Sequence, residues 1–226
     1  VFYFREFISN LINFNPIFVF LICGFFLVWL MNLYNFIDGV DGMAASGGIY
    51  ICLSVNLILF LNKHDSDVFV VFAILATCLS SFLIFNWPPA KLFMGDSGSL
   101  FLGYIFGAAI LKTFFDNHIS LFTWLIIFGW FFSDTTTTTI RRIFTVKKWY
   151  GEHRSHAYQN LAKKWNNHFK VTTYVLLYKV IYLLPLSVIS SFKPSLSIFL
   201  LILALLPAII FSLIYGGECK DEIDKL

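Results

Sequence analysis

The sequence contains little charge: only 13% of its 226 residues are Asp, Glu, Lys or Arg, about half the share of a soluble domain. Hydrophobic residues make up 58% and aromatic residues 19%, and 28 of them are phenylalanine. This composition excludes a soluble domain. The net charge of +3 is small and indicates no basic surface for nucleic acid. We therefore expect an integral membrane protein that contacts membrane lipid and binds no nucleic acid.

Cysteine is also scarce and has no recognisable spacing. Four cysteines occur without a Cys-x-x-Cys pair, and the first three, Cys23, Cys52 and Cys78, lie inside apolar segments. A disulfide framework or a zinc site is therefore not expected. The chain begins with neither Met nor a basic leader, so we expect no cleavable signal peptide and interpret the chain as a fragment of a longer protein.

Apolar runs long enough to cross a bilayer predict an all-α fold with about seven transmembrane helices. The predicted spans are 16–34, 44–61, 68–86, 99–115, 119–140, 171–192 and 195–215. We treat residues 1–226 as a single transmembrane domain.

Positive charge is concentrated in residues 141–170, which hold eight of the 16 Lys and Arg residues. Because Lys and Arg in short loops mark the cytoplasmic side, we expect this segment to be a basic cytoplasmic loop. The loops near residues 35–44 and 86–99 fall on the same face if the spans alternate. The catalytic loops are therefore predicted on the cytoplasmic face.

Polar side chains recur every three residues in NLYNFIDGVDG, at Asn32, Asn35, Asp38 and Asp41. Carboxylates beside hydrocarbon are costly, and the glycine after each Asp allows the backbone to approach a ligand. A helix cap and turn would explain one Asp-Gly. It would not explain two Asn and a second Asp-Gly, so we interpret the stretch as a ligand site.

A third carboxylate, Asp96, lies in AKLFMGDSGS. It could simply favour the dipole of a helix that Ser97 or Ser99 caps. Its loop is predicted to face the same side as Asp38 and Asp41, however, and a few carboxylates completed by phosphate and water suit Mg²⁺. Lys91 could contact phosphate, or it could extend its ammonium to the membrane interface.

The basic segment contains HRSH, a sequence denser in His and Arg than a topology signal or a lipid contact requires. Two His could ligate a metal, but Arg matches phosphate oxygens, so we interpret the segment as an anion clamp. Asp134 could pair with Arg141 or Arg142, or it could serve the site.

Four motifs in order, NxxNFIDGVDGMA, FNWPPAKLFMGDSGSLFLGY, DTxxTxxRR and EHRSHAYQ, resemble those of the polyprenyl-phosphate N-acetylhexosamine-1-phosphate transferases of glycosyltransferase family 4. The resemblance covers residues 16–215 and is greatest to the branch that starts O-antigen. The phospho-N-acetylmuramoyl-pentapeptide transferase is a more distant relative. The resemblance implies transfer of a sugar-1-phosphate from a UDP-N-acetylhexosamine to undecaprenyl phosphate, releasing UMP. It implies a cytoplasmic active site in the bacterial inner (plasma) membrane.

The resemblance also implies roles for individual residues. Asp96 and Asp38 would hold Mg²⁺, or Mn²⁺ in its place, and Phe93 would stack on uracil. The implied catalytic residues are Asp38, Asp41, Asp96, His153, Arg154 and His156. The implied substrate-binding residues are Asn32, Asn35, Asn86, Lys91, Phe93, Arg141 and Arg142.

One departure from the family pattern matters. The family carries an Asp-Asp pair and a Lys on an upstream loop, and this sequence contains no adjacent Asp-Asp. An inactive remnant that binds lipid or partner subunits is therefore the alternative. A transporter fits less well, because its acids should lie near mid-helix and an inverted repeat should be visible. Three questions stay open: which UDP-sugar is the donor, whether the reaction is a single displacement or a double displacement through Asp38, and whether the protein forms a homodimer.

Overall fold

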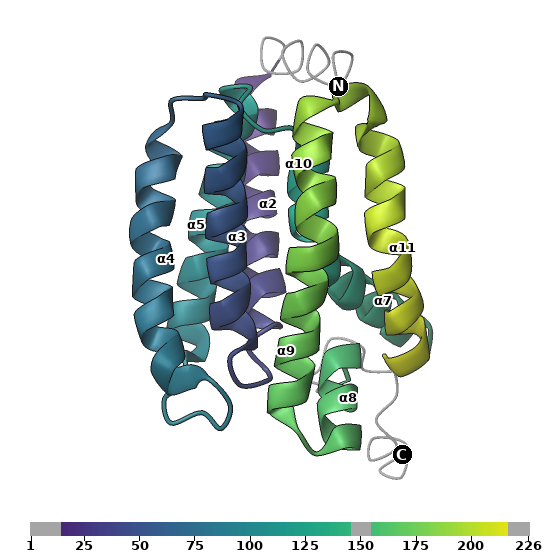
Figure 1. Ribbon diagram of the computed structural model, residues 1–226. Coiled ribbons are helices and arrows are strands. Elements are labelled where there is room, and N and C mark those ends of the chain that lie inside the picture. The colour runs from purple at the N-terminus through teal and green to yellow at the C-terminus, as the bar shows by residue number, and fades with distance from the viewer. Residues whose placement is uncertain (1–14, 146–154, 217–226) are drawn as a thin grey trace.

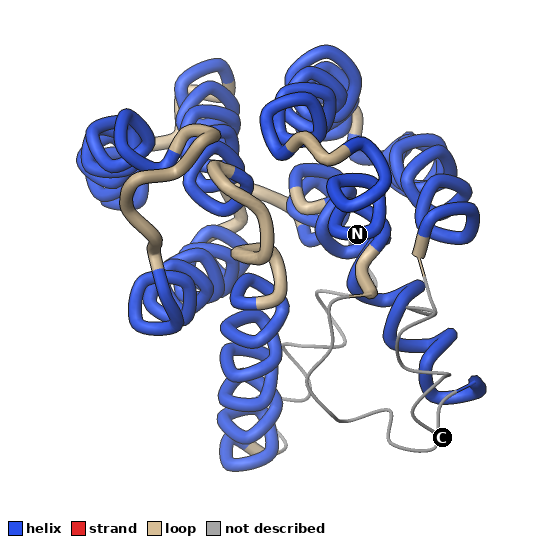
Figure 2. Tube along the Cα trace, turned by 90° about the horizontal axis from the view of Figure 1, so that it is seen from below, coloured by secondary structure: helices blue, strands red, loops and turns tan. Residues whose placement is uncertain are grey.

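The computed structural model describes residues 15–145 and 155–216, and within these ranges it contains helices and no strand. The elements in order are α2 (Pro16–Asn35), α3 (Met43–Leu61), α4 (Asp67–Asn86), α5 (Gly95–Phe115), α6 (Leu121–Ile127), α7 (Gly129–Thr145), α8 (Ala157–Trp165), α9 (His168–Tyr178), η1 (Lys179–Leu183), α10 (Leu184–Phe192), η2 (Pro194–Leu196) and α11 (Ser197–Tyr215). Figure 1 shows the long helices running along one axis, and Figure 2 shows most of them end-on. The all-α prediction is confirmed.

Six helical segments in the described part of the chain are long and apolar enough to cross a membrane: Pro16–Asn35, Met43–Leu61, Asp67–Asn86, Gly95–Phe115, His168–Phe192 and Pro194–Tyr215. They correspond to six of the seven predicted spans. The chain is therefore a multi-pass membrane protein.

The prediction of one helix over 119–140 is wrong. The segment forms two helices, α6 and α7, of 7 and 17 residues, which meet at Phe128 and Gly129. Its apolar run ends near Phe132, and the polar stretch from Ser133 to Thr139 follows. The break at Phe128 lies inside the apolar run, whereas the polar stretch, with its Asp134 carboxylate that is costly in hydrocarbon, lies within α7.

The basic segment also differs from the prediction of a single loop over residues 141–170. Residues 141–145 complete α7, residues 157–165 form α8, and α9 begins at His168. Asn166 joins α8 to α9 in the left-handed conformation. Lys163 and Lys164 lie in the last turn of α8, where positive charge is favourable to the helix dipole.

Helices α2 and α5 lie side by side because α5 carries glycine where they touch. A Cβ on Gly103 would lie 2.6 Å from Met31 Cα and 2.9 Å from the Leu30 carbonyl oxygen, both backbone atoms of α2. Small residues at such contacts allow membrane helices to approach closely. The contact fixes how the ends of α2 and α5, which carry the acidic motifs, lie relative to each other.

The beginning of α3 is fastened to the end of α2. The Tyr34 hydroxyl, fully buried, donates to the Ala44 carbonyl oxygen at 2.7 Å. The Tyr34 ring packs against Phe106 and Phe131, with centroids 5.1 and 6.1 Å away. Residues 36–42, here called the acidic loop, therefore span a short and fixed gap between two helices.

Candidate functional site

Asp38 in the acidic loop and Asp96 in α5 have different surroundings. Asp38 is half-buried, and Asp96 lies exposed in the first turn of α5. The pKa of the Asp38 carboxyl is raised to about 6, first by burial and also by the negative charge of Asp96, although a hydrogen bond from the Gly95 backbone opposes the rise. The negative charge of Asp96 raises the pKa of Asp38 only if the two carboxyls lie near each other. Asp38 and Asp96 are thus the acidic pair of the site.

Glycine in the left-handed conformation stands at the start of each helix that opens at the site. Gly42 has φ +71° just before α3, and Gly95, the first residue of α5, has φ +66°. Residues with a Cβ are disfavoured in this conformation. Gly42 and Gly95 thus set the direction of the chain, whereas Gly39, which follows Asp38, does not have a positive φ.

Asp41 does not join the acidic pair. Its Oδ2 accepts a hydrogen bond from the Ala90 backbone at 3.1 Å, and its Oδ1 lies 3.2 Å from His168 Nδ1. Its carbonyl oxygen accepts from the Thr172 hydroxyl at 2.8 Å. Both Asp41 carboxylate oxygens thus contact groups of the protein, which gives Asp41 a part in joining the acidic loop to α9 and to the loop before α5. Its implied catalytic role stays a prediction.

Asn86 ties the acidic loop to the loop between α4 and α5. It is 2% exposed; its Oδ1 accepts from the Gly42 backbone at 3.1 Å, and its Nδ2 donates to the Leu92 carbonyl oxygen at 2.8 Å. These bonds use one donor and one acceptor of the amide. The geometry gives Asn86 a positioning role, and its direct contact with a nucleotide stays a prediction.

The two other asparagines lie along α2. Asn35 Oδ1 accepts a hydrogen bond from the Ser99 hydroxyl of α5, so it joins the ends of the two helices that carry the acidic pair. Asn32 donates to the Val28 carbonyl oxygen at 2.8 Å, one turn earlier in its own helix. Asn35 is thus part of the site framework, whereas Asn32 is used locally.

Lys91 and Phe93 are exposed in the loop that precedes Asp96. Phe93 is 71% exposed. An exposed aromatic ring offers a stacking face, and an exposed lysine can contact an anion. The roles of both side chains in nucleotide binding stay predictions.

The basic residues are only partly within the structure. His153 and Arg154 lie outside the described residues. Arg141 donates to the Gly216 carbonyl oxygen at 2.6 Å, and buried Arg142 donates to the Ser155 hydroxyl at 3.3 Å. Their implied substrate contacts stay predictions.

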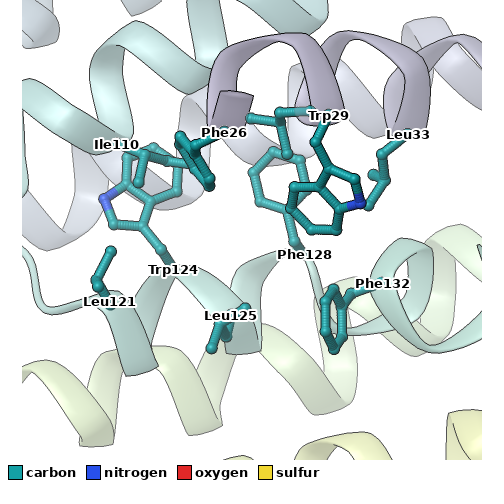
Figure 3. A pocket seen from close by; sticks show the side chains of 10 residues that line it. Phe26, Trp29, Leu33, Ile110, Leu121, Trp124, Leu125, Phe128 and Phe132 are labelled. Atoms are coloured by element: carbon teal, nitrogen blue, oxygen red, sulfur yellow. The ribbon is translucent and has the colours of Figure 1, made fainter. Parts of the chain in front are cut away.

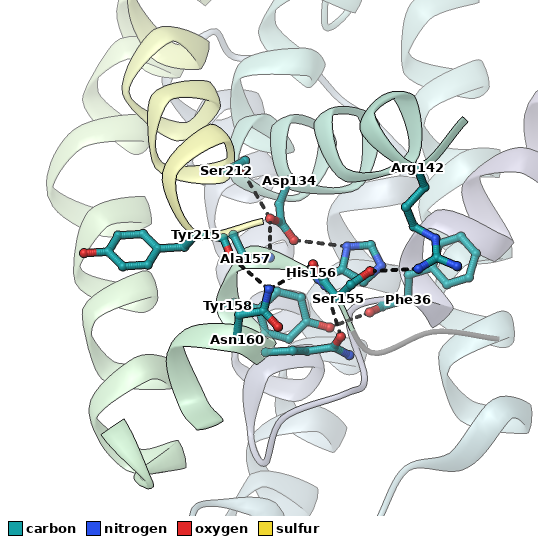
Figure 4. A network of polar contacts seen from close by, with 11 residues as sticks. Phe36, Asp134, Arg142, Ser155, His156, Ala157, Tyr158, Asn160, Ser212 and Tyr215 are labelled. Atoms are coloured by element: carbon teal, nitrogen blue, oxygen red, sulfur yellow. Dashed lines mark hydrogen bonds and ion pairs between the residues drawn. The ribbon is translucent and has the colours of Figure 1, made fainter. Parts of the chain in front are cut away.

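His156 is not exposed as a phosphate clamp requires: it is 2% exposed, and its Nδ1 lies 3.2 Å from Asp134 Oδ2 (Figure 4). Asp134 thus faces His156. The sequence left open whether Asp134 pairs with Arg141 or Arg142 or serves the site, and both alternatives stay predictions.

Sequence reasoning missed several residues that build the site. Ser99, His168 and Thr172 contact Asn35 or Asp41, and the sequence gives no periodic signal for them. Tyr158 and Gln159 are different, because they belong to the quoted motif EHRSHAYQ and were given no role. The Tyr158 hydroxyl donates to the Phe36 carbonyl oxygen of the acidic loop.

The acidic pair fits Mg²⁺ better than a metal held by protein alone. No group of three or more His, Cys, Asp or Glu side chains that could hold a metal occurs within residues 15–145 and 155–216. Mg²⁺ is commonly bound by one or two carboxylates together with substrate phosphates and water. Asp38 and Asp96 match that donor set.

An apolar pocket lies within the bundle, between α2, α5, α6 and α7 (Figure 3). Its wall includes Phe26, Trp29, Trp124, Phe128 and Phe132. Only apolar surface lines it, so it suits hydrocarbon and offers no partner for a polar group.

The raised pKa of Asp38 predicts a pH-dependent stability. An acid whose folded-state pKa lies above its unfolded value favours the protonated folded state, so its ionisation destabilises the protein as the pH rises from about 4 to about 6, and the loss is constant above that. Without divalent metal, Asp38→Asn should therefore raise the melting temperature at pH 8 and have little effect at pH 4. Asp67→Asn, whose carboxylate is 92% exposed, is the control. An equal shift at both pH values would contradict the assignment.

The fold and the site define a multi-pass membrane protein. Its acidic pair lies where the end of α2 meets the beginning of α5, at one end of the bundle. The chain belongs to glycosyl transferase family 4, whose sequence model matches residues 2–114. Over 183 residues it is 30% identical to a probable undecaprenyl-phosphate N-acetylglucosaminyl 1-phosphate transferase of Bacillus subtilis, covering 80% of this chain and 51% of the relative. The chain thus spans about half the length of that relative.

Two further relatives match shorter stretches. A decaprenyl-phosphate N-acetylglucosaminephosphotransferase of Mycolicibacterium smegmatis is 39% identical over 89 residues, 36% of this chain and 22% of the relative. A phospho-N-acetylmuramoyl-pentapeptide-transferase of Prochlorococcus marinus is 34% identical over 139 residues, 59% of this chain and 37% of the relative. The names of these relatives belong to the same family of transferases that the four sequence motifs resemble.

Proposed function

We propose that this chain carries the sugar-nucleotide half of a phosphoglycosyl transferase site. The reaction would transfer N-acetylhexosamine 1-phosphate from a UDP-sugar to undecaprenyl phosphate and release UMP, as the first step of O-antigen or a related cell-envelope glycan. The observation that carries the proposal is the acidic pair, Asp38 and Asp96, next to exposed Lys91 and Phe93. The site would face the cytoplasm at the bacterial inner membrane.

In this mechanism the lipid phosphate attacks the β-phosphorus of the UDP-sugar, and the phosphoanhydride bond to UMP breaks. Both reactants are anions, so catalysis of phosphoryl transfer rests mainly on positioning and electrostatics. Mg²⁺, when bound, would supply positive charge to the diphosphate. Asp38 and Asp96 would hold that cation, Phe93 would stack on the base, and Lys91 would contact a phosphate.

The apolar pocket offers a place for part of the polyprenyl chain. Its wall, from Phe26 to Phe132, belongs to helices that border the acidic pair through α2 and α5. Burial of an isoprenoid chain against aromatic side chains would be favourable at about 25 cal/mol per Å² of apolar surface. The lipid would then be held by its tail while its phosphate reaches the interface.

The proposal is tested with the purified chain in lipid nanodiscs, supplied with Mg²⁺, undecaprenyl phosphate and labelled UDP-N-acetylglucosamine or UDP-N-acetylgalactosamine. Release of UMP that needs both the lipid and Mg²⁺ would support it. If UMP appears only when the upstream half of a relative is co-expressed, the chain is the donor-binding half of a larger enzyme. Absence of UMP in both cases, with no saturable binding of either UDP-sugar, would favour the inactive remnant.

A further inference from the structure

Asp134 is a buried carboxylate that the proposed reaction does not use. It lies in α7, is 2% exposed and contacts α11 and the start of α8 (Figure 4). Its Oδ1 accepts hydrogen bonds from the Ala157 backbone at 3.0 Å and from the Ser212 hydroxyl at 3.1 Å, and its Oδ2 faces His156. A buried charge is retained only with such partners, and removing them leaves it uncompensated.

The segment that Asp134 holds, residues 155–159, lies against the acidic loop. The His156 ring is 5.7 Å from the Phe36 ring, centroid to centroid, and the Tyr158 hydroxyl donates to the Phe36 carbonyl oxygen. A Cβ on Gly39 would lie only 2.1 Å from Gln159 Nε2, so the two segments are in close contact at the residue next to Asp38. Displacement of residues 155–159 would therefore displace the loop that carries Asp38.

The last described helix completes the arrangement. Ser212, near the end of α11, holds Asp134, and the Tyr215 carbonyl oxygen accepts from Asn160 Nδ2 of α8 at 2.8 Å. The Gly216 carbonyl oxygen accepts from Arg141 of α7. The end of α11 thus joins α7 to α8 and holds residues 155–159 against the acidic loop.

We propose that Asp134, held by Ser212 of α11, is a positioning residue that fixes residues 155–159 through His156 and so sets the place of the Asp38 loop. The buried His156 then transmits this constraint to the acidic loop, through its pairing with Asp134 and the contact of its ring with Phe36. The inference assigns to the end of α11 a part in the acidic site. Its catalytic consequence rests on the proposed function, but its structural consequence does not.

The structural consequence is tested by hydrogen exchange in nanodiscs, which needs no turnover. Asp134→Ala should speed exchange of the amides in residues 36–42 by about tenfold, because the segment that covers them loses its anchor. Ser212→Ala, a milder change, should speed the same amides less, and it keeps the test informative if the first variant does not fold. Asp67→Asn is the matched carboxylate control. Unchanged exchange in residues 36–42 for both variants would overturn the proposal.

The catalytic consequence is tested by kinetics where UMP release is measurable. Asp134→Asn keeps an oxygen for the Ala157 backbone and removes the charge that faces His156, so kcat should fall by at least about tenfold, as expected when a reacting group is misplaced. KM for the UDP-sugar should change by less than about twofold. Asp134→Asn combined with His156→Gln should cost no more than the worse single change, because both remove one pairing. Fully additive losses would overturn the pairing; absence of activity in the wild type would count against the proposed function only.

Discussion

Asp96→Asn should lower Mg²⁺-dependent transfer by about a thousandfold, which corresponds to the several kcal/mol that a bound cation supplies to a developing phosphate charge. Asp96 is exposed in the first turn of α5, so the amide should be accommodated without loss of the fold. Asn keeps the shape of Asp but carries no charge, and a carboxylate is the ligand that Mg²⁺ requires here. The measurement is UMP release against Mg²⁺ concentration.

The matched control for this variant is Ser97→Ala, which changes the next exposed residue in the same turn. It should leave both the rate and the Mg²⁺ dependence close to the wild type. Both proteins should elute from size exclusion as the wild type does. Full Mg²⁺-dependent release of UMP by Asp96→Asn would remove Asp96 from the metal site.

Gly103→Ala should destabilise the protein by about 1–3 kcal/mol, the cost of forcing atoms into a packed contact. The new Cβ would meet backbone atoms of Met31 and Leu30, which cannot move aside as a flexible side chain could. Helices α2 and α5 would have to separate, and the hydrogen bond from Ser99 to Asn35, one turn away, would lengthen. We expect a lower melting temperature in detergent and weaker divalent-metal binding.

Gly24→Ala provides the control for Gly103→Ala, because it is the same change in α2 at a position with no atom within 4 Å of the added Cβ. It should leave the melting temperature unchanged or slightly raised, since Ala favours a helix more than Gly does. Equal behaviour of the two variants would show that close packing of α2 on α5 is not required.

The transmembrane architecture could be predicted because apolar runs of about 20 residues have few other uses. The prediction failed over residues 119–140, where the chain forms two helices that meet at Phe128, within the apolar half. A count of apolar residues gives no signal for a break at that position. The positions of α6 and α7 depend on the helices that they pack against, and the sequence alone does not reveal these packing partners.

The motifs identified the acidic residues, but not which groups of the protein contact them. Asp38 and Asp41 stand in the same Asp-Gly pattern, yet the charge of Asp96 affects Asp38 while Asp41 contacts Ala90 and His168. Likewise, HRSH predicts exposed basic groups, whereas His156 is buried against Asp134. In each case the partner comes from a distant segment, and only the tertiary fold decides which one.

The hydrogen bonds of Asn86 have a consequence for the thermodynamics of ligand binding. They join the acidic loop to the loop that carries Lys91 and Phe93 before any ligand arrives. Ordering a loop on binding costs conformational entropy, and a framework that is already joined avoids that cost. Immobilisation of the exposed Lys91 and Phe93 side chains then remains as the main ordering cost of nucleotide binding in this part of the site.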